Sequence, residues 1–212
     1  MELKKQRKRL IDAPITRHQI LQLLDNYKRP NDKISELIKK GELLSLRRGL
    51  YVPGPDTDLP IPESFLIANH LRGPSYVSLE TALAYWGLIP ERVYEVSSIT
   101  VKTSRIYKTP VGRFSYLHVK VPYYSFGIKY VLLTTKQAAL IASPEKALCD
   151  KIILTAGVTL RSITQTLDFL EEDLRINRQA LKALDSTLIN SWINNAGKKG
   201  SLEMLVKTLD TL

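Results

Sequence analysis

The sequence predicts an α+β protein with two parts, a small basic N-terminal part and a larger part in which strands precede helices. Three observations support this prediction. Apolar residues recur at helical spacing and then alternate within the first fifty-odd residues. A proline-rich stretch follows, and beyond it strand-like segments come before a helical tail. We therefore expect an N-terminal winged helix-turn-helix followed by a mixed antiparallel-sheet and helical C-terminal domain.

The first helix is predicted to begin after Thr16, a residue type that caps helix N-termini. Its apolar face consists of Ile20, Leu23, Leu24 and Tyr27. Asn31 is the expected cap of a second helix, and Gly41 is its expected stop. The apolar face of this second helix consists of Ile34, Leu37 and Ile38.

A short hairpin is predicted next. Leu44 and Leu46 alternate with polar Ser45, the turn falls at Arg47-Arg48-Gly49, and Leu50–Val52 returns. The tip of the hairpin therefore carries two arginines. Helix, turn, helix and hairpin is the order of a winged helix-turn-helix, with the hairpin as the wing.

The proline-rich stretch Val52–Pro62 contains four prolines and one glycine, so it is predicted to be extended and to separate two domains. The expected division is a DNA-binding domain over residues 1–54, a linker over 55–62 and an α+β domain over 63–212.

Charge is concentrated before this linker. The net charge is +10, and Met1–Pro55 holds 13 lysines and arginines against 6 acidic residues, a net of +7. A basic balance favours a polyanionic partner, although a solvated basic face is the alternative interpretation. The sequence Lys4–Arg9 is either a flexible arm that contacts phosphates or a terminus with no role.

A second helix that enters a major groove would present its polar side chains to bases and phosphates. The wing arginines would reach phosphates or the adjacent minor groove. Asp32 is assigned to the helix dipole, and Glu36 either accepts from a cytosine or lies off the contact face. The predicted DNA-binding residues are Lys28, Arg29, Asn31, Lys33, Ser35, Lys39, Lys40, Arg47 and Arg48.

In the larger part, Leu79–Trp86 is predicted to be a helix capped by Ser78. The predicted strands are Val93–Val101, Phe114–Val121 and Tyr130–Leu133. The first two are expected to form an antiparallel hairpin that turns at Thr109–Gly112. Ser143 and Pro144 predict another helix start. Further helix starts are expected at Thr159, Asn177, Asp185 and Ser201.

The run from Ile34 to Val52 resembles the winged helix of AbiEi-type antitoxins, the regulators of type IV toxin–antitoxin and abortive-infection systems. Ser75–Pro90 is similar to the opening of that family's second domain, and Ser143–Asp150 to its SPEKAL-type helix start. The resemblance implies a repressor that binds repeats in its own promoter. It also implies a nucleotidyltransferase-like toxin whose effect the protein counters, with or without direct contact.

The sequence gives less support to a catalytic function than to DNA binding. A nucleotidyltransferase needs two carboxylates after its Gly-Ser turn, and only Asp210 follows Gly200-Ser201. A nuclease needs an acidic residue before Asp/Glu-x-Lys on a strand, and the one such tripeptide begins at Glu2. The three histidines lack ligand-like spacing. We therefore expect no enzyme activity, no catalytic residue, no metal and no cofactor.

Apolar segments and cysteine usage predict where in the cell the protein is located. The longest uncharged stretch has 12 residues, short of the roughly 18–20 that a membrane-spanning helix needs, and no apolar signal region follows Lys4–Arg9. Cys149 is the one cysteine, so no disulfide framework exists, and it is predicted to be a core residue. A cytoplasmic protein without a membrane partner is expected.

The function expected from these features is a DNA-binding antitoxin and transcriptional autorepressor. The alternative is a protein-interaction module that modulates a partner enzyme, with the winged helix as scaffold.

Overall fold

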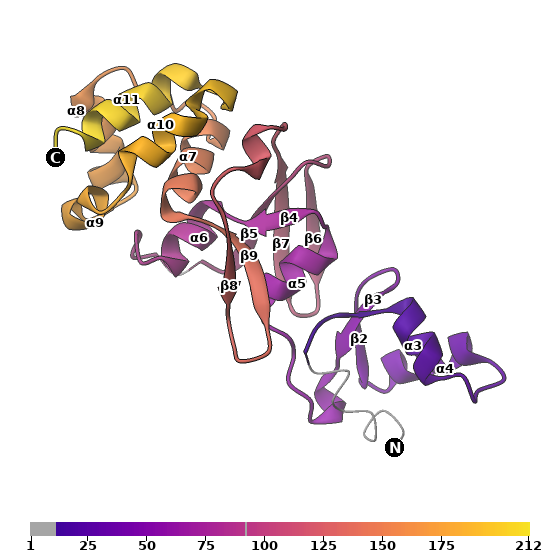
Figure 1. Ribbon diagram of the computed structural model, residues 1–212. Helices are drawn as coiled ribbons and strands as arrows, with labels where there is room; N and C mark the ends of the chain where they lie inside the picture. The colour runs from indigo at the N-terminus through magenta and orange to yellow at the C-terminus, as the bar shows by residue number, and fades with distance from the viewer. Residues whose placement is uncertain (1–11, 92) are drawn as a thin grey trace.

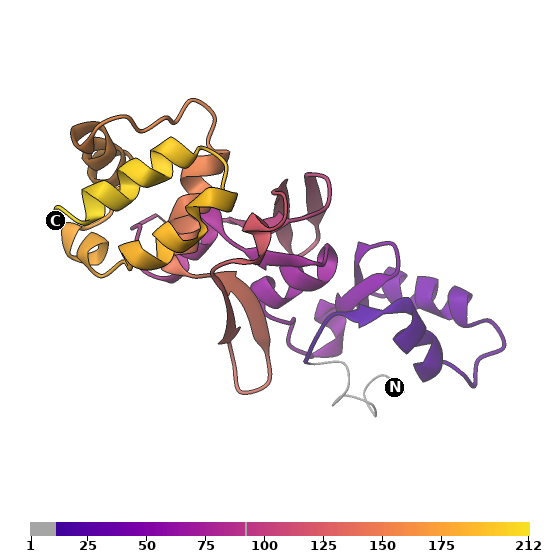
Figure 2. The ribbon, with the colours of Figure 1, turned by 45° about the horizontal axis from the view of Figure 1, so that its top comes forward.

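A computed structural model describes residues 12–91 and 93–212, which form an α+β protein with two separate sheets (Figure 1). The sequence Lys4–Arg9 lies outside the described residues. The smaller sheet belongs to the N-terminal unit, residues 12–54, and the larger sheet to the C-terminal unit, residues 55–212. The molecule is elongated, with the N-terminal unit at one end and the last helices at the other (Figures 1 and 2).

The N-terminal unit packs two helices against a three-stranded antiparallel sheet of order β1-β3-β2. The helices are α3 (Arg17–Leu23) and α4 (Pro30–Lys39), and the strands are β1 (Ile15–Thr16), β2 (Leu43–Arg47) and β3 (Leu50–Pro53). The two helices and the hairpin predicted from periodicity are therefore present. Strand β1 was not predicted, because two residues are too short to show a pattern.

Local capping signals determine most helix ends in this unit. Thr16 caps α3 through a reciprocal capping box with Gln19, as predicted. Gly41 has a φ of +68° and ends α4 in a Schellman motif, in which Glu42 N donates to Leu37 O at 2.9 Å. The predicted Asn31 cap is wrong. The N-cap is Arg29 and the helix begins at Pro30, two residues earlier than predicted, because the fixed φ of proline suits the first helical position.

The β2–β3 hairpin has one face in each of two apolar cores. Leu43 and Tyr51 pack with the helices of the N-terminal unit. Leu46, Leu50 and Val52, from the opposite face, belong to the core of the C-terminal unit. Because alternate side chains of a strand point to opposite sides, this hairpin joins the two units.

The predicted linker is partly structured. Strand β3 continues through Pro53, and a short 3₁₀ helix covers Pro55–Thr57. The chain passes so close to Gly41 that a Cβ on Gly54 would lie 1.9 Å from the Gly41 carbonyl oxygen. Helix α5 (Ser64–Leu71) follows and packs against the larger sheet.

The larger sheet has six strands in the order β6-β7-β5-β4-β9-β8. It is mixed, because β5 runs parallel to β7 and β4 parallel to β9, while the other neighbours are antiparallel. The strands are β4 (Ser75–Val77), β5 (Glu95–Thr100), β6 (Arg105–Thr109), β7 (Gly112–His118), β8 (Ile128–Leu132) and β9 (Ala138–Ala142).

The predicted antiparallel hairpin in this sheet is wrong. The turn at Thr109–Gly112 joins β6 to β7, and β6 was not predicted. The segment Arg105–Thr109 is largely exposed and lacks a clean apolar alternation, so its sequence gives little sign of a strand. Once β6 occupies the antiparallel position, β5 pairs with β7 in parallel from Glu95 opposite Arg113 to Thr100 opposite His118.

Helices gather at one end of the larger sheet. Helix α6 (Leu79–Tyr85) packs on α7 (Pro144–Leu154), and α7 contacts α10 and α11 (Figure 1). The predicted helix starts at Asn177 and Asp185 are confirmed, but those at Thr159 and Ser201 are wrong, because the caps are Ser162 and Lys198. The remaining helical segments are α8 (Ile163–Leu167), a π-helix (Asp168–Asp173), α9 (Arg178–Lys182), α10 (Ser186–Trp192) and α11 (Lys199–Leu209), with 3₁₀ turns at Tyr123–Ser125 and Ile193–Asn195.

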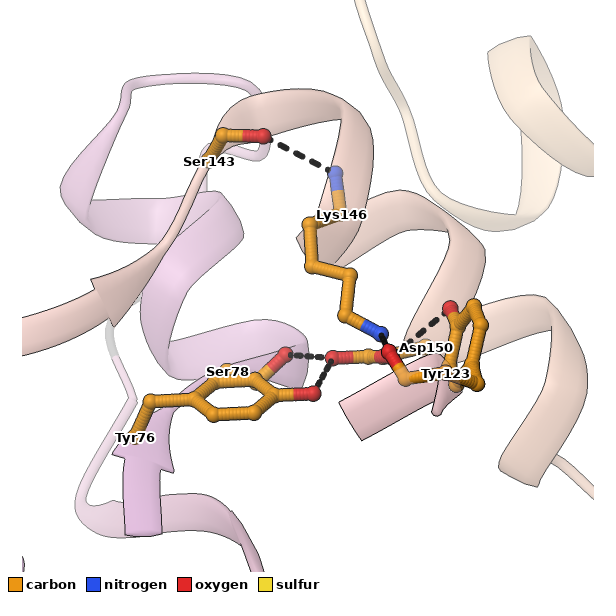
Figure 3. A network of polar contacts seen from close by, with 6 residues as sticks. All are labelled: Tyr76, Ser78, Tyr123, Ser143, Lys146 and Asp150. Carbon is orange, nitrogen blue, oxygen red and sulfur yellow. Dashed lines mark hydrogen bonds and ion pairs between the residues drawn. The ribbon is translucent and has the colours of Figure 1, made fainter. Parts of the chain in front are cut away.

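Helix α7 carries a buried ion pair (Figure 3). Lys146 and Asp150, one turn apart on α7, are both fully buried with 3.0 Å between Nζ and Oδ1. The Asp150 carboxylate also accepts hydrogen bonds from Tyr76 OH, Ser78 Oγ and Tyr123 OH at 2.7–3.0 Å. Ser78 precedes α6, but its side chain makes this bond instead of capping the helix. The network therefore ties β4, α6 and α7 together.

Burial changes the acidity of the groups in this network. Burial and the Asp150 charge raise the pKa values of Tyr76 and Tyr123 well above 10.0. Burial lowers the pKa of Lys146, and the Asp150 carboxylate opposes that shift. Lys146 also donates to the Tyr123 carbonyl oxygen at 3.1 Å, and its Nζ lies 3.0 Å from the Tyr123 ring centroid. Every charged atom thus has a partner, which is what a buried ion pair requires.

Candidate nucleic-acid interface

Helix α4 turns its apolar residues Ile34 and Leu37 toward α3 and the small sheet. Its opposite side is open to solvent. Of the predicted DNA-binding residues on this helix and at its C-cap, Asn31, Ser35, Lys39 and Lys40 are exposed and Lys33 is half-buried. The exposed part of the helix therefore carries hydroxyl, amide and ammonium groups, of which the Ser35 hydroxyl donates to the Asn31 carbonyl oxygen at 3.2 Å.

The charge on this side is partly neutralised by Glu36. Its carboxylate lies 2.6 Å from Lys40 Nζ and 2.9 Å from Lys33 Nζ. Hydrogen bonds from Lys40 and Lys33 lower the pKa of Glu36 to about 2, and the bond to Glu36 raises the pKa of Lys33. Among the described residues, no carboxylate pairs with Lys39. Neither alternative given for Glu36, a bond from a cytosine or a position off the contact face, included this arrangement, in which Glu36 pairs with two lysines.

The turn before α4 carries Lys28 and Arg29, and both are exposed. Arg29 lies 3.9 Å from the Asp32 carboxylate, a pair that is open to solvent. The Asn31 side chain accepts a hydrogen bond from Arg17 Nη2 at 2.8 Å. Arg17, the first residue of α3, therefore bridges the two helices and adds a cation that the sequence analysis did not include.

The hairpin presents its two arginines differently. Arg47 Nε donates to the carbonyl oxygen of Leu71 at 2.9 Å, and Arg47 Nη1 to that of Arg48 at 3.3 Å. Arg48 is exposed in the turn itself. Gly49, with a φ of +81°, closes this turn, and its carbonyl oxygen accepts from Arg17 N at 2.9 Å. The hairpin tip thus lies beside the start of α3.

The fold brings three further cations, which no sequence pattern predicts, to this hairpin. A hollow of about 410 Å³ lies between the hairpin and the C-terminal unit. Besides Arg47 and Arg48 it is lined by Arg72, Lys102 and Arg105. These positions are far from the hairpin in the sequence and belong to no local motif, so only the pairing of β6 with β7 and the position of α5 bring them to it.

Two other kinds of site, a metal centre and a membrane-spanning helix, are absent from the described residues. No three His, Cys, Asp or Glu side chains among residues 12–91 and 93–212 lie close enough to hold a metal ion. Within the same residues, every helix is too short or too polar to span a bilayer. Cys149 is buried, as predicted, and Tyr116 and Tyr123 are buried as well, so neither tyrosine is available to stack on a nucleic-acid base. No protein-family model and no curated protein matches the sequence.

Proposed function

We propose that this protein is a DNA-binding antitoxin and transcriptional autorepressor, and that its N-terminal unit is a winged helix-turn-helix. The observation that carries the proposal is the packing of α3 and α4 against the sheet of order β1-β3-β2, in which β2 and β3 form a hairpin. In a winged helix-turn-helix the second helix enters the major groove and the hairpin lies along the adjacent backbone.

Charges in this unit support the assignment of α4 as the helix that contacts DNA. The exposed side of α4 carries donors, and its apolar side is buried against α3. Lys28 and Arg29 lie in the turn before it, and Arg48 lies at the hairpin turn. Phosphate contacts from such flanking cations fix the register of a protein on a duplex, while the helix reads base edges.

The antitoxin part of the proposal rests on the family resemblance of three stretches between Ile34 and Asp150. In this proposal the C-terminal unit counters a nucleotidyltransferase-like toxin, and the N-terminal unit represses the operon through promoter repeats. The proposed location is the cytoplasm.

Fluorescence anisotropy with DNA from upstream of the protein's own gene tests the DNA-binding part. The full chain is expected to bind this duplex more tightly than a scrambled one. The double variant K39Q/R48Q is expected to bind more weakly and with a smaller salt dependence. K182Q/K207Q, which removes two exposed cations from the C-terminal helices, is the charge-matched control. Equal binding by both variants at several salt concentrations would contradict the proposal.

The antitoxin part has a separate test. Expression of the neighbouring nucleotidyltransferase-like gene is expected to arrest growth, and co-expression of this protein is expected to restore it. The same rescue by K39Q/R48Q would assign antitoxicity to the C-terminal unit and not to operon repression.

A second candidate function is a protein-interaction module that modulates a partner enzyme. A hollow of about 580 Å³ favours it, because apolar side chains such as Ile106 and Leu154 make up much of its lining. Its two carboxylates, Glu80 and Glu95, are already paired with Lys151 and Arg113. A largely apolar surface with paired charges suits a protein partner. Co-purification with the toxin without retained promoter DNA would favour this candidate.

A further inference from the structure

The hollow between the hairpin and the C-terminal unit concentrates positive charge. We call it the basic hollow and define it by its cations, Arg47, Arg48, Arg72, Lys102 and Arg105. Two of them come from β2 and the hairpin turn, one follows α5, one lies in the loop after β5, and one begins β6. Two parts of the chain that are separate in sequence therefore build one site.

No carboxylate of the described residues balances these cations. Among the described residues, none of the five is in an ion pair, whereas other surface cations such as Arg113 and Arg175 pair with glutamates. Like charges held together in one hollow repel one another, and water screens this repulsion only in part. An anion from solution would relieve it.

Main-chain carbonyls hold three of the cationic groups in position. Arg47 Nε donates to Leu71 O at 2.9 Å, Arg72 Nη2 to Thr103 O at 2.6 Å, and Lys102 Nζ to Gly73 O at 2.5 Å. These bonds fix the side chains without neutralising them. A ligand would therefore lose less free energy to the ordering of long side chains than at an ordinary basic surface.

Some N–H groups of these cations remain available to donate to a ligand. Arg72 Nε is buried and has no hydrogen-bond partner among the described residues. The Arg105 guanidinium lies over the Tyr107 ring, 4.9 Å from its centroid, and that tyrosine also lines the hollow. Guanidinium forks match the oxygen spacing of phosphate, and arginine binds phosphate in two-point contacts.

We propose that the basic hollow is a phosphate-binding site that bridges the N-terminal and C-terminal units. The phosphate comes either from the backbone of bound DNA or from a free nucleotide or polyphosphate. The DNA source rests on the proposed function, and the free source does not. Because the cations come from both units, an occupied site holds the hairpin against α5 and β6 and fixes the orientation of α4 relative to the C-terminal unit.

Calorimetric titration of the full chain with inorganic pyrophosphate tests the site itself. K102Q/R105Q removes two exposed cations of the hollow and leaves α4 and the hairpin unchanged. Pyrophosphate is expected to bind this variant about tenfold more weakly than the parent, since two cation–phosphate contacts are lost. K182Q/K207Q is expected to bind as the parent does. Equal affinity in all three proteins would overturn the proposal. If the double variant fails to fold, R105Q alone, which removes the guanidinium over the Tyr107 ring, provides the same comparison.

A short duplex distinguishes the two sources. If DNA supplies the phosphate, the duplex displaces pyrophosphate, and K102Q/R105Q lowers the salt slope of duplex binding by about two. If a free phosphate is the ligand, duplex binding is the same in this variant and in the control, while pyrophosphate binding falls. A parent that binds pyrophosphate but no duplex would refute the proposed function and leave the site standing. A parent that binds duplex but no pyrophosphate, with no change in K102Q/R105Q, would refute the site and leave the function standing.

Discussion

Arg47 Nε donates a hydrogen bond to the carbonyl oxygen of Leu71, the last residue of α5, at 2.9 Å. The last carbonyls of a helix have no partner within the helix, and a cation there also complements the helix dipole. This bond therefore fastens the β2–β3 hairpin to the C-terminal unit. The neighbouring Arg48 makes no comparable bond from its side chain among the described residues, so the two arginines have separable roles.

Replacement of each arginine by alanine is expected to separate these roles. Arg47→Ala should lower the free energy of unfolding by about 1–3 kcal/mol, because the partly buried Leu71 carbonyl loses its donor. Arg48→Ala should leave the stability unchanged and lower the salt slope of duplex binding by about one. Thermal melts together with anisotropy titrations at several salt concentrations measure both effects. Equal melting temperatures for the two variants would contradict the assigned role of Arg47.

Glu36 is expected to limit DNA affinity, because its carboxylate holds Lys33 and Lys40. Glu36→Gln should release both lysines, tighten binding to a random-sequence duplex and raise the salt slope by up to about two. Glu203→Gln, which breaks an exposed pair with Lys199 on α11, is the control. An unchanged slope in Glu36→Gln would show that these lysines do not reach phosphate.

Acid should leave the Glu36 pairs intact until the pH is very low. The pKa of Glu36 is lowered from 4.5 to about 2 in the folded state. Its contribution to stability is therefore complete above pH 4.5 and is lost as the pH falls toward 2. A carboxyl-carbon NMR titration measures this pKa directly. A midpoint near 4.5 in the folded protein would contradict the contacts described for Glu36.

Removal of only one partner of the buried Lys146–Asp150 pair should strongly destabilise the protein. Asp150→Ala leaves a buried ammonium and three hydroxyl groups without their acceptor, and it should destabilise the protein by about 3–5 kcal/mol. The double variant Lys146→Met, Asp150→Leu removes both charges and should regain part of that loss. Urea denaturation of the two variants and the parent tests this. A double variant no more stable than Asp150→Ala would contradict it.

Cys149 is expected to be unreactive in the folded protein. Burial, with the Asp150 charge, raises the pKa of its thiol from 9.0 to about 12, and the side chain is fully buried. Its contribution to stability is complete below pH 9.0 and is lost as the pH rises through 12. Alkylation at pH 9.0 should therefore proceed only through unfolding, at a rate that rises with added urea. Fast alkylation without denaturant would show that the thiol is accessible.

Gly54 should tolerate no side chain. A Cβ at this position would meet the Gly41 carbonyl oxygen at 1.9 Å, and neither backbone can move without disrupting the end of α4 or β3. Gly54→Ala should lower the melting temperature and weaken duplex binding. Gly200→Ala, at an open position in α11, should instead raise stability by up to about 1 kcal/mol. Equal melting temperatures would contradict the close crossing at Gly54.

Local signals explain which elements could be predicted. Thr16, Gly41 and Ser143 act within one helical turn, so their capping roles can be read from neighbouring residues. Strand β6 and the parallel pairing of β5 with β7 depend on partners elsewhere in the chain, and no local pattern encodes them. Asn31 looked like a cap by residue type, but the preference of Pro30 for the first helical turn prevailed.

The residues of the candidate interface likewise fall into those that local patterns predict and those that only the tertiary fold brings together. Lys39 and Arg48 belong to a helix and a turn whose patterns are visible in the sequence. Arg72, Lys102 and Arg105 join the basic hollow only because α5, the loop after β5 and β6 meet the hairpin. The pairing of Glu36 with two lysines depends on side-chain conformations, which residue spacing permits but does not fix.

The two-sided hairpin limits how far the protein can be taken apart. A chain cut after Pro53 would leave Leu46, Leu50 and Val52 uncovered, since these residues are buried against the C-terminal unit. Such a fragment would tend to aggregate, even though it retains both helices and all three strands of its sheet. Chimaeras that graft this N-terminal unit onto another protein should therefore carry over the apolar surface of the C-terminal unit that covers these residues, or replace the three residues with polar ones.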